Sequence, residues 1–71
     1  MRSEHIAAIW IPFSAEDKED AYQFLRLYTR FFAKMNPHIV IDFTEYIERP
    51  NFYANGDSSL GAKIFYREKN G

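Results

Sequence analysis

The strongest indication of structure is the stretch SAEDKEDAYQFLRLYTRFFAKMNP, residues 14–37. Its apolar residues recur three and four positions apart, as they do on the buried stripe of an amphipathic helix. Acidic residues gather at its beginning, where they favour the positive end of the helix dipole, and Ser14 is the expected N-cap. Pro37 ends the pattern because it disfavours a helical residue before it. We therefore predict a helix over residues 15–35, whose apolar stripe comprises Ala21, Phe24, Leu25, Tyr28, Phe31, Phe32 and Met35.

Three strands are predicted around this helix. Residues 6–13, IAAIWIPF, are rich in β-branched and aromatic side chains, and Pro12 lies near their end, where a missing amide proton is tolerated. The apolar period changes to two over residues 38–48, which predicts a second strand. Residues 60–67 alternate in the same way and predict a third strand.

The second strand is expected to have one buried and one solvated face. Ile39, Ile41 and Phe43 fall on one face by simple alternation. The alternation slips over residues 45–47, which suggests a β-bulge or a bend there. A polar loop over residues 50–59 follows, and it carries the two aromatic residues Phe52 and Tyr53.

The order strand, helix, strand, strand predicts a single small α+β domain over residues 1–71. A right-handed crossover makes the first two strands parallel, and the last two form an antiparallel hairpin. We expect one helix packed on a three-stranded mixed sheet, whose strand order the sequence does not determine. The arrangement considered places the third strand between the other two. This is half of a ferredoxin-like arrangement, and the missing second helix leaves part of one sheet face and an edge strand without a partner.

The composition excludes several classes of protein. The chain has 71 residues, a net charge of −1, an aromatic content of 18% and no cysteine, so disulfides, thiolate metal sites and thiol nucleophiles are excluded. The balanced charge argues against a generic DNA coat protein. The apolar run over residues 6–13 is too short for a signal peptide or a membrane helix, so we expect a cytoplasmic protein.

No pattern of catalytic or metal-binding residues emerges. The chain contains neither a phosphate-binding loop nor a nucleophile elbow. His38 and Asp42 on one strand would be about 13 Å apart, which is too far to share a metal ion. Asp42, Glu45 and Glu48 are interpreted as solvated strand charges that discourage edge association. We therefore predict a protein without enzymatic activity, metal or cofactor.

The surplus of aromatic residues is the main indication of function, because aromatic and arginine side chains dominate the centres of protein interfaces. We predict a homodimeric, protein-binding regulator or inhibitor that occludes its target, in the manner of phage or mobile-element accessory proteins. The expected patch consists of Trp10, Phe52, Tyr53 and Phe65, and the exposed helix face contributes Arg26, Arg30 and Lys34 for electrostatic steering.

The alternative function is binding of single-stranded nucleic acid, with sheet aromatics stacking on bases and the helix cations contacting phosphates. Residues 61–66, GAKIFY, resemble the central strand of an RNA-recognition module in having a glycine before the strand. Ala62 and Ile64, however, occupy the positions where that module carries stacking aromatics. Protein binding is therefore the favoured prediction.

Overall fold

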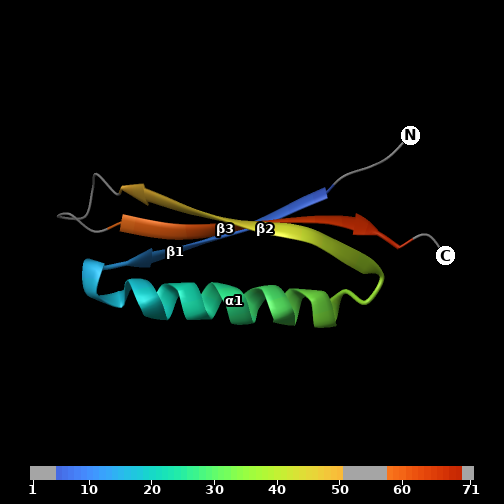
Figure 1. The fold of residues 1–71 in the computed structure, drawn as a ribbon, viewed down its shortest axis with the longest axis horizontal. Helices are drawn as coiled ribbons and strands as arrows, with labels where there is room; N and C mark the ends of the chain where they lie inside the picture. The colour runs from blue at the N-terminus through green and yellow to red at the C-terminus, as the bar shows by residue number, and fades with distance from the viewer. Residues whose placement is uncertain (1–4, 51–57, 70–71) are drawn as a thin grey trace.

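The computed structural model of the chain describes residues 5–50 and 58–69. Figure 1 shows one helix lying along one face of a three-stranded sheet, which confirms the predicted α+β fold. In chain order the elements are β1 (His5–Phe13), the 3-10 turn η1 (Ala15–Asp17), α1 (Lys18–Met35), β2 (Ile39–Pro50) and β3 (Ser58–Glu68).

The strands lie in the order β1-β3-β2, and β3 pairs antiparallel with both of its neighbours. The strand order, which the sequence left open, therefore places the third strand in the middle, as in half of a ferredoxin-like sheet. β1 and β2 run in the same direction, as the crossover predicts, but they are separated by β3 and form no ladder. The sheet that we expected to be mixed thus contains only antiparallel pairs.

The two ends of the helical segment are set by local hydrogen bonds. Ser14 has the extended backbone of an N-cap, and its carbonyl accepts a hydrogen bond from the amide of Asp17 at 3.0 Å. Its hydroxyl donates to the Asp17 carboxylate at 2.9 Å, so the expected side-chain cap onto a backbone amide is not formed. At the other end, the Asn36 side chain donates to the Phe32 carbonyl at 2.9 Å, which ends α1 before Pro37 as predicted.

The core lies between α1 and the middle of the sheet. Leu25 of α1 and Leu60 and Ile64 of β3 have no exposed surface. Even-numbered residues of β3 face the helix because side chains alternate along a strand. The remaining buried apolar residues are Phe13, Ala21, Ile39 and Ala62.

A β-bulge at Asp42 changes which side chains of β2 face the helix. Ile41 lies opposite Tyr66, yet Phe43 lies opposite Phe65, so Asp42 is an extra residue without a partner in the ladder. One inserted residue reverses the alternation after it. Phe43 therefore lies on the face opposite to Ile41, and both the predicted bulge at residues 45–47 and the predicted common face of Ile41 and Phe43 were wrong.

An ion pair joins the beginning of α1 to β2. The Lys18 ammonium lies 3.1 Å from the Glu48 carboxylate. The hydrogen bond with Glu48 and then its negative charge raise the pKa of Lys18 above its ordinary value. The stabilisation from this pair is therefore present below the ordinary lysine pKa and is lost as the pH rises through the raised value.

We expect Glu48→Gln to lower the pKa of Lys18 toward that of a free lysine, because the amide keeps the shape of the side chain and loses its charge. NMR titration of the Lys18 side chain between neutral and strongly alkaline pH measures this shift. Lys63 serves as the internal reference, since Glu48 does not face it across the sheet. An unchanged Lys18 titration in the variant would contradict the pairing.

Candidate functional site

The sheet face opposite α1 is uncovered by any described element, and we name it the open face (Figure 1). The strand registers define its members, because directly opposed residues lie on the same face. They are Ile6, Ala8, Trp10 and Pro12 of β1, Val40, Phe43, Glu45, Ile47 and Arg49 of β2, and Ser59, Gly61, Lys63, Phe65 and Arg67 of β3. The bulge residue Asp42, which has no partner in the register, joins this face through its ion pair with Arg67.

Trp10 lies across the central strand. It is paired with Gly61, and a Cβ atom built on Gly61 would overlap Cε3, Cζ3 and Cδ2 of the indole ring. The absence of a side chain at Gly61 therefore lets the ring lie flat on β3. The Arg49 guanidinium lies over the same ring, 4.3 Å from its centroid, in a cation–π contact. This Arg49–Trp10–Gly61 stack links all three strands.

A second aromatic group lies farther along the open face. The rings of Phe43 and Phe65 are stacked with their centroids 4.4 Å apart and their planes 14° apart. Phe43 is 57% exposed, and Ile6 beside Phe65 is 56% exposed. Apolar surface of this kind is typical of a binding surface when it is contiguous.

The charged groups of the open face are largely matched with one another. Arg67 donates from Nε to both carboxylate oxygens of Asp42, at 2.9 and 3.0 Å, and its Nη2 lies 2.9 Å from Oδ1. Glu45 and Lys63 are directly opposed in the ladder. Arg49 lies opposite the uncharged Ser59 in the register and covers Trp10. The open face is therefore close to electrically neutral.

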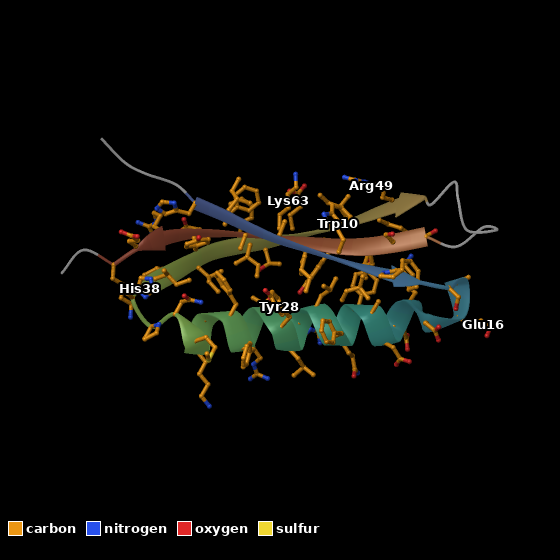
Figure 2. The ribbon with its side chains drawn as sticks, turned by 180° about the vertical axis from the view of Figure 1, so that it is seen from behind. Trp10, Glu16, Tyr28, His38, Arg49 and Lys63 are labelled. Carbon is orange, nitrogen blue, oxygen red and sulfur yellow. The ribbon has the colours of Figure 1, made fainter. Side chains whose placement is uncertain are left out.

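The predicted site residues are divided between two surfaces. Trp10 and Phe65 lie on the open face, and Figure 2 shows Trp10 with Arg49 and Lys63 on the side of the sheet away from the helix. The predicted helix cations are exposed on α1, which covers the other face; they are Arg26, Arg30 and Lys34. Phe52 and Tyr53 lie outside the described residues.

Sequence reasoning missed two members of the site. Phe43 was assigned to the buried face because the bulge at Asp42 has no turn residue or proline to mark it. Arg49 lay just beyond the predicted second strand, residues 38–48, and was given no role. The signal for Arg49 was the pair of Trp10 and Gly61 on opposed strands, because a ring that lies over glycine leaves its upper face free for a cation.

Metal-ligating side chains are not clustered in the part of the chain that the structure describes. No group of three His, Asp or Glu side chains within residues 5–50 and 58–69 is arranged to hold a metal ion. In the same ranges, α1 is not apolar enough to cross a membrane. Comparison with known proteins adds no assignment, since no family model, no curated protein and no solved structure matches the chain.

Proposed function

We propose that this chain is a protein-binding domain that regulates or inhibits a target by covering part of its surface with the open face. The observation that carries the proposal is the Phe43–Phe65 pair, in which Phe43 is exposed, on the same sheet face as the Arg49–Trp10 stack. Tryptophan and arginine are among the side chains that supply most of the energy at the centres of protein interfaces, and phenylalanine is enriched there. The antiparallel sheet holds these side chains in fixed positions, so little conformational entropy is lost on binding.

The charge of the open face favours a protein over a nucleic acid as partner. Asp42 and Glu45 on this face offset Arg67 and Lys63, whereas phosphate backbones are bound by an excess of cations. Phe43 and Phe65 also stack on each other, which leaves each ring only one side for a base. The cations of α1 lie on the opposite side of the molecule, so one strand of nucleic acid contacting the aromatics would not reach them.

The proposal is tested with Phe43→Ala. Proteins captured from the source cells by the tagged full chain and by the variant are compared by quantitative mass spectrometry, and the affinity of each differential partner is then measured with purified components. We expect Phe43→Ala to weaken binding by about 2 kcal/mol or more, roughly 30-fold, because its ring is a desolvated anchor in the complex. Trp10→Ala is expected to act in the same direction.

The matched control is Leu27→Ala on α1, which removes a side chain that is 59% exposed, compared with 57% for Phe43. This control is expected to bind the partner normally. Equal affinities of Phe43→Ala, Trp10→Ala and the parent chain would contradict the proposal. Tight binding of single-stranded oligonucleotides that weakens with salt and depends on Phe43 would instead favour the nucleic-acid function.

A further inference from the structure

The two edges of the sheet differ in how they are protected. β2 carries the bulge at Asp42 and the charged residues Glu45, Glu48 and Arg49, all of which discourage pairing with another strand. β1 is nine residues long, and its segment Ile6–Phe13 contains no charged residue. Its only protection is Pro12 near the end. β1 is therefore a long, uncharged edge that is ready to pair.

An apolar row of α1 lies on the same side of the molecule as the β1 edge. We name it the helix seam, and it consists of Phe24, Tyr28, Phe31 and Met35. Phe24 lines a shallow pocket with Ile11 and Phe13 of β1, which places the seam on the β1 side. The other flank of α1 faces β2, as the edge-to-face contact of Tyr22 with Tyr46 shows.

The helix seam is exposed although it is strongly apolar. Phe24, Phe31 and Met35 are 50%, 57% and 61% exposed. The seam has the alternating four- and three-residue spacing of a coiled-coil interface, in which side chains of two helices interlock. An adjoining strand edge and helix seam together form the surface that a further strand and helix would cover in a complete two-layer domain.

We propose that a second copy of this chain covers the β1 edge and the helix seam, and that the two copies form a symmetric dimer with one continuous six-stranded sheet. In such a dimer β1 pairs antiparallel with β1 of the partner, and the two α1 helices lie antiparallel on one side of the sheet. The pairing is centred near Ile9. Even-numbered residues of one β1 must lie opposite even-numbered residues of the other, because only then do both helices cover the same face of the sheet. This inference does not depend on the proposed function.

Charge and area both fit a second copy. Asp17 and Asp20 lie at the beginning of the helical segment on the β1 side, and Lys34 lies in the last turn of α1. Antiparallel helices therefore bring the acidic end of one copy to the basic end of the other, and their dipoles oppose each other favourably. A nine-residue strand is about 30 Å long, and a sheet with one helix layer is about 20 Å thick. The contact surface of each copy therefore measures about 600 Å², which is near the ~800 Å² that each partner buries in a standard interface.

The test compares two identical substitutions at equally exposed phenylalanines, Phe31→Glu on the helix seam and Phe43→Glu on the open face, each 57% exposed. Light scattering after size exclusion is run on the full chain across a dilution series. We expect the parent and Phe43→Glu to show twice the chain mass of 8.4 kDa. Phe31→Glu is expected to dissociate at least about 100-fold more readily, because symmetry places two glutamates in the interface. Circular dichroism confirms that each variant is folded.

Hydrogen exchange gives an independent readout that needs no variant. In a free edge strand, alternate backbone amides point to solvent and exchange fast. In the proposed dimer, all backbone amides over residues 7–11 of β1 exchange slowly, whereas β2 keeps alternating fast and slow amides. Dilution separates the copies and restores fast exchange in β1. A monomer at all concentrations, alternating protection in β1 of a dimer, or dissociation by Phe43→Glu but not Phe31→Glu would each overturn the proposal. Loss of partner binding in a variant that still dimerises would bear on the proposed function of the open face and would leave the dimer proposal unchanged.

Discussion

Leu25→Ala is expected to leave the chain largely unfolded at room temperature. Leu25 of α1 is fully buried against the sheet, and truncation of a buried leucine to alanine costs about 2–5 kcal/mol. The hydrophobic core of a domain of this size supplies only about 3–5 kcal/mol in total. The loss is severe because Leu25 contacts the same core cluster as Leu60 and Ala62, and no other fully buried side chain comes from the helix. Urea unfolding followed by far-ultraviolet circular dichroism measures the effect.

Leu27→Ala is the matched control for this prediction. It makes the same chemical change two residues farther along α1, at a side chain that is 59% exposed. We expect a change in stability within about 0.5 kcal/mol, as for other exposed positions. Both variants must be compared at one protein concentration, since self-association would add to the apparent stability. Equal destabilisation by the two substitutions would contradict the packing of α1 described above.

Gly61→Ala is the second substitution with a large expected effect, although it adds a single methyl group. The new Cβ would overlap the indole ring of Trp10, so the ring must leave the central strand and its contact with Arg49. Overpacking of this kind costs about 1–3 kcal/mol. Trp10 is the single tryptophan of the chain, so its fluorescence spectrum reports the displacement directly.

A double-mutant cycle with Trp10→Ala separates the clash from other effects of the alanine. Without the indole ring, Gly61→Ala is expected to be neutral or stabilising, because glycine in a strand interior costs about 0.5–1 kcal/mol relative to alanine. If Gly61→Ala lowered the free energy of unfolding equally with and without the indole, the ring would not lie on the central strand.

The element order and the fold class could be predicted from the sequence because each rests on a regular period. The helix was marked by its apolar stripe, by Ser14 before it and by Pro37 after it, and the predicted range of residues 15–35 agrees with η1 and α1 together. The central position of β3 was not determined by the sequence, since the right-handed crossover predicted only that β1 and β2 run in the same direction. Trp10 and Phe65 were assigned to the binding patch and lie on the open face.

The face of Phe43 could not be predicted in the same way. Alternation along a strand carries no information about an inserted residue unless the insertion has its own signal. At Asp42 the signal is a tertiary contact, the ion pair with Arg67, which lies 25 residues away in the sequence. The exposure of Phe24 and Phe31 was missed for a related reason, since a helix on a three-stranded sheet can bury only part of a wide apolar stripe.

The bulge at Asp42 also limits how far such a sheet can grow. A sheet with two unprotected edges would recruit a new chain at each end, and association would continue into a fibre. Here β2 is bent at the bulge and charged along its length, so only β1 is suited to receive another strand. The interruption of the ladder at Asp42, together with these charges, would therefore keep the proposed assembly finite. Deleting Asp42 would restore the regular alternation of β2 and remove part of that limit.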